Sequence, residues 1–376
     1  MEQNLLKLFL TILLILITGF ADTFQVRAQI SNNPNRTLSP QTWQFAVSGD
    51  SRNCGDVVMP TIAGDISRNN ARFYWHLGDL RAIYDFDEDI KNRAGALPLT
   101  IVGYENAAWQ DFIDNQINTF KVPFFLGIGN HETISPKSRN EFLIQFADWL
   151  NAPVIAQQRL KDNPADHRLK AYYHWQQNGI DFIYLDNATT DQFDSAQLGW
   201  LNSVLRADDT DSTITTVVVG MHEALPDSLA SDHSMSDYPS GVQSGRAVYE
   251  RLLQTQNTAH KLVYILASHS HFLMEGIFNS DYWKAHGGVI PGWIVGTAGA
   301  VRYKLPPNAE TLARQAKTNV YGYLLATVNP TGEPAGTIRF DFHELKQADV
   351  PPEVQTKFGA ELVQWCFEKN SNVPLK

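Results

Sequence analysis

The sequence has no excess of basic residues, and it has no long apolar run beyond its N-terminal segment. Among 376 residues, 30 Lys and Arg stand against 40 Asp and Glu, so the formal net charge is −10. This balance argues against a nucleic-acid-coating protein, because phosphate backbones need basic patches. The composition, 43% hydrophobic and 19% charged, is ordinary for a globular protein and argues against a disordered chain, a collagen or a polytopic membrane protein.

Cysteine is scarce, with only Cys54 and Cys366 in the chain. In an oxidising compartment the two can form one disulfide, although sequence alone cannot establish that they are close. An inert thiol is the other expected state. A ligand or reactive role for Cys54 is conceivable, because it follows a candidate metal-binding Asp, but a catalytic thiol would need a base partner that the sequence does not identify.

The N-terminal apolar segment predicts an export signal. Lys7 precedes uncharged residues 8–21, whose core LFLTILLILI is short for a membrane span. Small-residue cleavage contexts end at Ala21 and Ala28, and we favour cleavage after Ala28, with an uncleaved anchor as the alternative. No Cys lies beside either context, which argues against a lipoprotein. We therefore expect a signal peptide over 1–28 and a periplasmic or secreted protein with no stable membrane span after cleavage.

The remaining chain is expected to form a single α/β domain. Residues 29–43 are polar and turn-rich and predict a short N-terminal tether. Over 44–345, short apolar runs typical of strands buried on both faces alternate with helix-like stretches, without a repeat, low-complexity segment or linker. Residues 346–376 are expected to be a C-terminal tail packed on or near this domain.

Several elements follow from apolar periodicity. Strand-like runs that end in polar residues of catalytic type cover 44–51, 72–80, 122–132, 215–223 and 261–271. Further strands are expected at 179–187 and 292–300, with a hairpin of 321–329 and 336–345. Helices are expected at 106–120, 195–207 and 245–257.

The five polar run ends carry side chains that can bind metals. In chain order they are Asp50; Asp79; Asn130 with His131; His222; and His269 with His271. Open α/β sheets bind ligands at the carboxyl ends of their strands, so these side chains are expected to converge. Carboxylate, amide and imidazole together suit Zn, Fe or Mn. A carboxylate that bridges two ions about 3.5–4 Å apart supports water activation and stabilises phosphoryl oxygens, which predicts phosphoester hydrolysis.

Each motif alone is weak, because Gly-Asp pairs are common and a lone His at a strand end is usually structural. The order of all five carries the prediction. The series GD, GD, GNHE, a His after VVVG, and HxH resembles the calcineurin-like metallophosphoesterase superfamily, which includes the purple acid phosphatases, over about residues 44–300.

The resemblance implies a four-layer αββα sandwich with the site at its strand ends. It implies a phosphatase or phosphodiesterase that uses two metal ions (Fe, Mn or Zn) and a metal-activated hydroxide on a phosphorylated small molecule or nucleotide. It assigns the ligand roles by motif: Asp50 and His271 bind the first metal, Asp79 bridges, and Asn130, His222 and His269 bind the second. His131 matches the residue that contacts the phosphoryl group and can protonate the leaving group.

The first motif departs from the family pattern. Family members usually have Asp-x-His there, whereas this chain has Asp50-Ser51-Arg52. Purple acid phosphatases instead use a Tyr three residues after the bridging Asp, and that position is Ala82. Three alternatives for the incomplete shell stay open: water completes it, which we favour; Tyr84 or Cys54 fills it; or the site holds metal weakly.

Arg52 is a candidate catalytic residue. A guanidinium stays protonated and cannot be an ordinary metal ligand, but it can clamp a phosphate oxygen bidentately. A solvated or structural Arg is the equal alternative. Arg81, which closely follows the bridging Asp, is a secondary candidate for a phosphate contact.

A rival interpretation is a non-catalytic metal- or phosphate-binding protein on the same fold, and a thiol-dependent hydrolase is a third. Substrate choice, monoester or diester, is expected to depend on the loops 81–105, 133–178 and 225–245, and the last of these is expected to be a flexible loop over the site. The sequence does not indicate an oligomeric state.

Overall fold

The computed structural model describes residues 41–92, 99–188, 192–230 and 233–373. The predicted signal peptide at 1–28 and nearly all of the predicted tether at 29–43 lie outside the described residues. Within the described ranges, no helix combines the length and the hydropathy that are needed to cross a bilayer.

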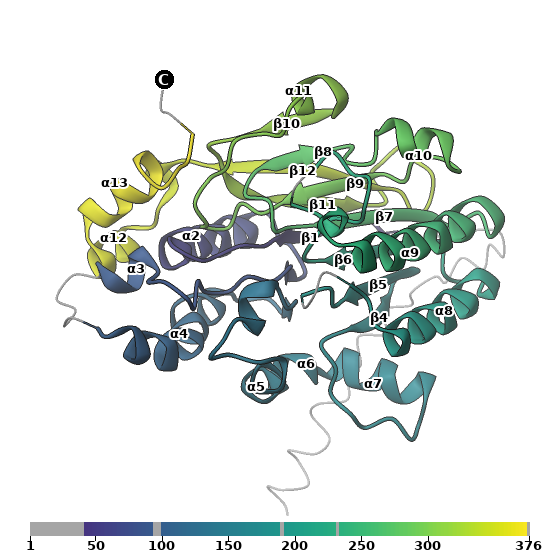
Figure 1. The fold of residues 1–376 in the computed structure, drawn as a ribbon, viewed down its shortest axis with the longest axis horizontal. Coiled ribbons are helices and arrows are strands. Elements are labelled where there is room, and N and C mark those ends of the chain that lie inside the picture. Colours follow the sequence, from purple (N-terminus) through teal and green to yellow (C-terminus); the bar gives the residue numbers. More distant parts are fainter. Residues whose placement is uncertain (1–40, 93–98, 189–191, 231–232, 374–376) are drawn as a thin grey trace, which may run out of the picture. The chain divides into compact units, whose positions relative to one another are not determined.

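Two β-sheets form the centre of the domain (Figure 1). The first has the order β12-β11-β1-β2-β3 and the second the order β10-β8-β9-β7-β6-β5-β4. The strands of the first sheet are β1 (Trp43–Ser48), β2 (Tyr74–His76), β3 (Phe124–Leu126), β11 (Tyr321–Val328) and β12 (Ile338–Leu345). Those of the second are β4 (Tyr173–Gln177), β5 (Ile180–Leu185), β6 (Thr216–Met221), β7 (Leu262–Ala267), β8 (Leu273–Glu275), β9 (Gly292–Val295) and β10 (Gln315–Lys317).

Helices cover the outer face of each sheet (Figure 1). On one side α2 (Gly55–Arg68) packs against β11 and against α4 (Ile101–Asn115). On the other side α9 (Pro239–Thr258) packs against β7 and against α8 (Ser195–Thr210). The predicted four-layer αββα sandwich is therefore confirmed.

The remaining helices are short. They are α3 (Glu88–Lys91), α5 (Arg139–Gln145), α6 (Ala147–Leu150), α7 (Pro153–Asp162), α10 (Asp281–Ala285), α11 (Ala309–Leu312), α12 (Pro352–Phe358) and α13 (Ala360–Glu368). Single 3₁₀ turns are η1 (Ile117–Thr119), η2 (Asn130–Thr133), η3 (Met235–Asp237) and η4 (Gln347–Asp349).

An aromatic layer joins the two sheets. Phe45 of β1 and Phe73, which directly precedes β2, both contact Phe182 of β5 edge to face. The ring centroids are 5.2 Å apart for Phe45 and 5.3 Å apart for Phe73. Phe125 of β3 stacks on Trp175 of β4 at 4.1 Å. Such rings bury large apolar areas and prefer offset or edge-to-face geometry. This layer fixes the two sheets against each other below the strand ends.

The strand directions bring the polar run ends to one edge. In the first sheet β1, β2 and β3 are parallel neighbours, and in the second β5, β6, β7 and β9 are parallel neighbours. Carboxyl ends of parallel strands lie on the same edge of a sheet. The loops after β1, β2, β3, β6 and β7 therefore share one edge of the sandwich.

The expected hairpin and the expected helices are present, although their bounds differ by several residues. The structure adds α2, which the sequence analysis did not name. Its positions from Gly55 to Ala63 are all buried, so no amphipathic period marks the helix, and Pro60 lies inside it. An interior Pro normally argues against a helix because it removes a backbone donor.

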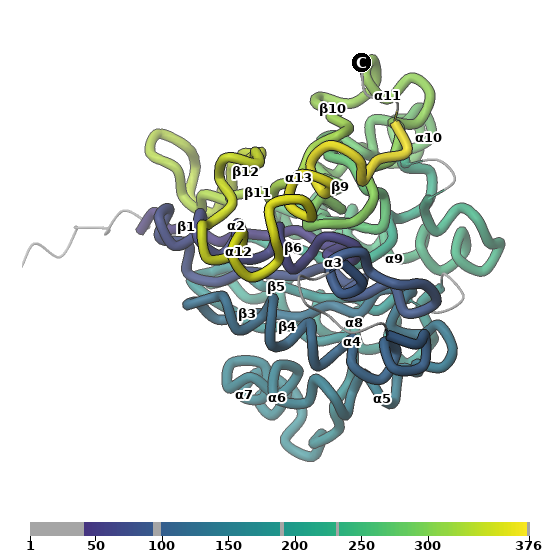
Figure 2. The backbone as a smooth tube through the Cα atoms, turned by 90° about the vertical axis from the view of Figure 1, so that its left-hand side faces the viewer, coloured from purple at the N-terminus to yellow at the C-terminus, as the bar shows by residue number. Residues whose placement is uncertain are grey.

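The C-terminal segment, expected as a tail packed on or near the domain, contains the two helices α12 and α13. α12 packs on α2, as both views show (Figures 1 and 2), and a disulfide joins Cys54 to Cys366 of α13. The paired cysteines exclude a thiolate ligand or a thiol-dependent hydrolase at Cys54. In the chain-entropy model, a cross-link between residues 312 positions apart contributes about 5–6 kcal/mol to the free energy of unfolding.

Candidate metal centre

The structure brings the eight sequence-predicted site residues into one contact network at the shared strand edge. Asp50 and Asp79 follow β1 and β2, Asn130 and His131 begin η2 after β3, and His222 directly follows β6. His269 and His271 follow β7, and Arg52 follows Asp50. Residues far apart in sequence thus meet because their strands are parallel neighbours.

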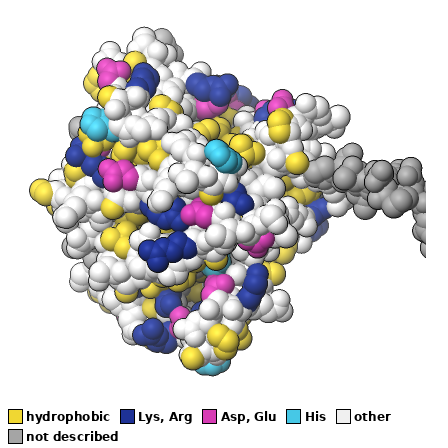
Figure 3. Space-filling model, turned by 90° about the vertical axis from the view of Figure 1, so that its right-hand side faces the viewer, with side chains coloured by type: hydrophobic (Ala, Val, Ile, Leu, Met, Phe, Trp, Pro, Cys, Tyr) yellow, Lys and Arg dark blue, Asp and Glu magenta, His cyan; other side chains and the backbone are white. Residues whose placement is uncertain are grey.

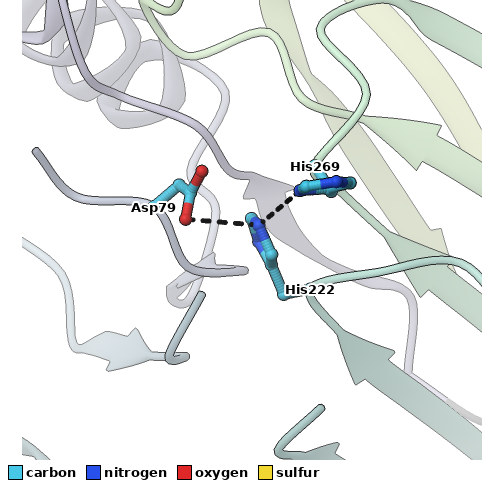
Figure 4. Close-up of side chains that lie close together, drawn as sticks. All are labelled: Asp79, His222 and His269. Atoms are coloured by element: carbon cyan, nitrogen blue, oxygen red, sulfur yellow. Dashed lines mark hydrogen bonds and ion pairs between the residues drawn. The ribbon is translucent and has the colours of Figure 1, made fainter. Parts of the chain in front are cut away.

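Four ligand candidates, Asp79, Asn130, His222 and His269, form cluster one. His222 Nε2 lies 3.2 Å from Asp79 Oδ1, 3.0 Å from Asn130 Oδ1 and 3.1 Å from His269 Nδ1. Figure 4 shows His222 between the carboxylate and the second imidazole. Imidazole nitrogen and carboxylate oxygen bind divalent ions at about 2.0–2.2 Å, and converging donors of these types are what such an ion requires.

Three ligand candidates, Asp50, Asp79 and His271, form cluster two. Their candidate donor atoms all lie within 4.8 Å of one another, as do those of Asp79, His222 and His269. His271 Nε2 is 3.2 Å from Asp50 Oδ1. Asp79 belongs to both clusters, which is the arrangement expected of a bridging carboxylate.

Three imidazoles have their orientation fixed by a backbone carbonyl. The Nδ1 of His222 donates to Leu77 O at 3.0 Å, that of His271 to Val301 O at 2.7 Å, and that of His131 to Ala82 O at 2.6 Å. This pattern leaves each Nε2 atom facing the site. Metal-binding histidines commonly have this second hydrogen bond, because it sets the tautomer and the ring plane.

Both acidic side chains have an oxygen that fits a cation. Asp50 Oδ1 and Asp79 Oδ2 are buried and have no hydrogen-bond partner among the described residues. The other Asp50 oxygen accepts from Ser268 Oγ and, at 2.8 Å, from the His269 backbone N–H. A buried, unpaired carboxylate oxygen costs free energy unless a cation or donor satisfies it. These orphan oxygens show that the donor set suits metal ions.

The electrostatics favour ionised carboxylates and neutral rings at His131 and His271. Burial opposes ionisation, but His271 lowers the pKa of Asp50 to about 2, and His131 and His222 hold the pKa of Asp79 well below its usual range. Burial lowers the pKa of His131 to about 4. Burial likewise lowers the pKa of His271, as does the adjacent Arg52. Neutral imidazoles keep the lone pairs that bind metals. His222 differs: burial opposes its protonation, but the Asp79 carboxylate raises its pKa to about 10, so a metal ion has to displace its Nε2 proton.

Three site residues adopt a left-handed backbone. The φ angles of Asp50, Asp79 and His269 are 61°, 59° and 63°. Non-glycine residues in this region cost conformational free energy and persist where the surrounding structure fixes them, often at functional sites. Glycines leave the necessary room: a Cβ on Gly129 would lie 2.3 Å from Asp79 Oδ1, and one on Gly296 would lie 2.7 Å from Asp50 Oδ2.

Arg52 lies inside the network and not at its rim. Its guanidinium donates from Nη2 to His271 Nε2 at 3.0 Å, contacts His131 Nε2 through Nη1, and has Nε 3.7 Å from Asp79 Oδ2. Only 6% of the residue is exposed. The solvated alternative for Arg52 is therefore excluded. Tyr84, a proposed gap filler, instead covers His131 with ring centroids 5.0 Å apart and is 59% exposed.

Sequence reasoning missed several residues that support the site. Glu132 accepts from the backbone N–H groups of Asp79, Leu80 and Gly129 at 2.7–2.9 Å, so it ties two ligand loops together. Its place directly after Asn130-His131 is a signal that could have identified it. Tyr303, whose ring lies 4.0 Å from that of His271, carries no local sequence signal.

Arg81 is not a phosphate contact. It is fully buried and ion-paired with Asp56, Asp87, Asp89 and Asp111. Asp87 also accepts from the backbone N–H groups of Asn53 and Ala82, which flank the ligand loops. Arg81 therefore neutralises a buried acidic cluster beneath the site and holds the loops in place.

The segment 225–245, expected as a flexible loop, is largely anchored. Leu225 and Met235 are fully buried, and α9 already begins at Pro239. His233 is exposed, with its ring 5.6 Å from that of His269 and 5.3 Å from that of Tyr303. It lies beside the metal centre without belonging to either cluster.

A cavity lies away from these clusters. It has a volume of about 660 Å³ and lies between α7, β4 and α8, with His174, Trp200 and Asp208 in its lining. Size alone does not assign function, and the converging metal donors identify the metal centre as the candidate site.

We expect Arg81→Met to lower the free energy of unfolding by about 3–5 kcal/mol, because it leaves buried carboxylates without their cation. The deficit should shrink as the pH falls. Burial and Asp56 already hold the pKa of Asp89 well above its usual range, so the folded variant takes up protons before the unfolded chain does. Urea denaturation between neutral and mildly acidic pH measures both effects.

The control is Arg68→Met, which removes an exposed arginine paired with Asp65 on the same helix. Exposed pairs contribute about 0–1 kcal/mol. Equal losses in the two variants, or a deficit for Arg81→Met that does not depend on pH, would contradict the buried-cluster account.

Comparison with known proteins agrees with this geometry. A model of the calcineurin-like phosphoesterase family matches residues 57–273. No curated protein matches the sequence. Similar solved structures include the purple acid phosphatase PPD1 from yellow lupin (Lupinus luteus) seeds, with a TM-score of 0.51 and 16% identity over 81% of this chain and 52% of that chain. Another is a dimetal phosphatase from Danio rerio, with a TM-score of 0.47 and 12% identity over 81% of this chain and 98% of that chain.

The chain spans about half the length of the lupin enzyme. At this level of identity the likeness shows the fold alone. The family match, in contrast, extends over more than half of the sequence and includes five of the six predicted metal ligands. The chain belongs to the calcineurin-like phosphoesterase family, whose members are metal-dependent phosphoric ester hydrolases.

Proposed function

We propose that this chain hydrolyses phosphoester bonds of small phosphorylated molecules or nucleotides, as a phosphatase or phosphodiesterase. The observation that carries the proposal is the shared position of Asp79, whose carboxylate belongs to both ligand clusters and has one buried oxygen without a hydrogen-bond partner among the described residues. In the proposed assignment cluster one and cluster two hold metal ions (Fe, Mn or Zn), with Asp79 as the bridge. When bound, such ions lower the pKa of water and neutralise phosphoryl oxygens.

His131 is proposed to contact the phosphoryl group and to give a proton to the leaving oxygen. Its Nε2 faces the site, 3.6 Å from Asp79 Oδ2, while Nδ1 is held by Ala82 O. The low pKa leaves the resting ring neutral with its proton on Nδ1, so Nε2 has to take up a proton from water before it can act as an acid. Negative charge of a bound phosphoryl group beside Nε2 favours this uptake, and Nε2 then returns the proton to the leaving oxygen. The backbone N–H of His131 donates to Asp79 Oδ1 at 3.0 Å, and this hydrogen bond holds the His131 loop beside the Asp79 carboxylate.

Arg52 is proposed to supply positive charge to the substrate's phosphoryl oxygens. Its pKa is raised further above its usual value, since the Asp79 carboxylate outweighs the effect of burial, so it stays charged. The net acidity of the chain does not prevent an anion from approaching. On the face shown in Figure 3, acidic and basic side chains are interspersed, and the site carries its own local cations.

The second candidate is a non-catalytic metal- or phosphate-binding protein. The observation that favours it is Arg52, which replaces the expected histidine ligand of cluster two. The two functions differ in turnover, because a binding protein retains metal and phosphate but releases no product.

The test is hydrolysis of an aryl phosphomonoester and an aryl phosphodiester by the metal-loaded protein, before and after a chelator. We expect turnover of at least one ester, its loss on chelation, and its recovery with added metal. Asp79→Asn should lower kcat/KM by about a hundredfold or more and reduce the bound metal, because both clusters lose a ligand.

Asp341→Asn is the matched control, since Asp341 is exposed on β12 and pairs only with Arg339 in the described structure. It should leave metal content and kinetics unchanged. Full turnover by Asp79→Asn would refute the proposed centre, and phosphate binding without turnover of either ester would favour the binding protein.

We also propose that the protein acts in the periplasm or after secretion. Support comes from the apolar segment at 8–21 with its small-residue cleavage contexts and from the Cys54–Cys366 disulfide, because disulfides persist in oxidising compartments. Mass spectrometry of the protein isolated from its native host should show loss of the first 21 or 28 residues and no free thiol after unreduced denaturation. An intact Met1 together with free Cys54 and Cys366 would exclude export.

A further inference from the structure

Arg52 and a metal ion require the same lone pair in cluster two. The Nδ1–H of His271 is committed to Val301 O at 2.7 Å, so a neutral ring has one lone pair left, on Nε2. Arg52 Nη2 already donates to that nitrogen at 3.0 Å. An ion bound there at about 2.0–2.1 Å would need the same electrons and overlap with the guanidinium.

The position of Arg52 is fixed on all sides by site residues. Nη1 contacts His131, Nη2 bonds His271, and Nε faces Asp79 Oδ2 at 3.7 Å. The Tyr303 ring packs on His271 and limits how that imidazole can move away. Because the side chain is almost fully buried, Arg52 has to break its contacts with His271 and Asp79 before cluster two can bind a metal ion.

The charge balance of the site also disfavours a metal ion in cluster two. Together the two clusters contain two carboxylates, Asp50 and the shared Asp79, and Arg52 already supplies one positive charge beside them. One divalent ion in cluster one together with Arg52 exceeds the negative charge of both carboxylates. A second divalent ion beside the buried guanidinium would add like-charge repulsion at short range.

Among the described residues, no guanidinium occupies a ring nitrogen of the two cluster-one imidazoles, His222 and His269. The donors of cluster one converge on His222 Nε2, which lies 3.2 Å from Asp79 Oδ1. Arg52 contacts His131, His271 and Asp79, and within the described part of the chain it makes no hydrogen bond or ion pair with His222 or His269. Asp50 Oδ1, which has no hydrogen-bond partner among the described residues, leaves cluster two with a residual attraction for cations. The two clusters are therefore unequal.

We infer that Arg52 is an internal cation that competes with the metal ion of cluster two, so that the resting protein retains one tightly bound ion, in cluster one. This inference rests on the proposed function and gives the two metal positions different affinities. Arg52 then provides, from within the chain, the charge that a second ion would bring to a phosphoryl oxygen.

The test is the metal stoichiometry of purified protein loaded with excess Mn²⁺ or Zn²⁺, desalted, and analysed for metal and protein. We expect about one equivalent in the unaltered chain and about two in Arg52→Ala and in Arg52→His, of which the latter adds an imidazole donor. With Mn²⁺, electron paramagnetic resonance should show an isolated ion in the unaltered chain and an exchange-coupled pair in both variants.

Two controls locate the additional ion. Arg52→Ala combined with His271→Ala should return to about one equivalent, because His271 belongs only to cluster two. Arg206→Ala, which removes an exposed arginine of α8, should match the unaltered chain. Thermal unfolding followed by circular dichroism identifies any variant that does not fold. If Arg52→Ala does not fold, the metal stoichiometry of Arg52→His decides the test.

The outcomes separate this inference from the proposed function. Two tightly held ions in the unaltered chain, or an unchanged single ion in folded Arg52→Ala and Arg52→His, would overturn the competition and leave metal-dependent hydrolysis intact. Failure of every form to hold any ion would overturn both.

Discussion

Two buried carboxylates, Asp50 and Asp79, impose the constraint on which the arrangement of the site depends. Each has an oxygen held by donors of the protein and an oxygen that has no hydrogen-bond partner among the described residues. Buried negative charge is costly unless positive charge or donors surround it. Compensation of this buried negative charge is the shared role of the imidazoles, the Arg52 guanidinium and the implied metal ions.

The scaffold delivers these groups through strand direction and through strained turns. Parallel strands place their following loops on one edge, and left-handed conformations at Asp50, Asp79 and His269 aim side chains inward. Glu132 and the buried ion cluster around Arg81 hold the loops from below. Such supporting contacts keep donor atoms close enough to share an ion without collapse of the loops.

The local order of an apolar run followed by a polar residue predicted an α/β domain and the ligand candidates, and the resemblance to the family added the four-layer sandwich. Sequence patterns could not predict α2, whose continuous burial hides the helical period, nor the burial of Arg81, because its four carboxylate partners come from separate segments. The competition at His271 was equally hidden. Arg52 was identifiable as a departure from the family pattern, but only the structure shows that it shares a lone pair with cluster two.

The central claim is that Asp79, Asn130, His222 and His269 hold a metal ion. Anomalous diffraction from crystals loaded with Mn²⁺ or Zn²⁺, recorded on both sides of the absorption edge of the metal, tests it directly. We expect the strongest anomalous peak among these four side chains, within about 2.0–2.3 Å of His222 Nε2. An ordered site without a peak there, or a dominant peak elsewhere in the protein, would contradict the account.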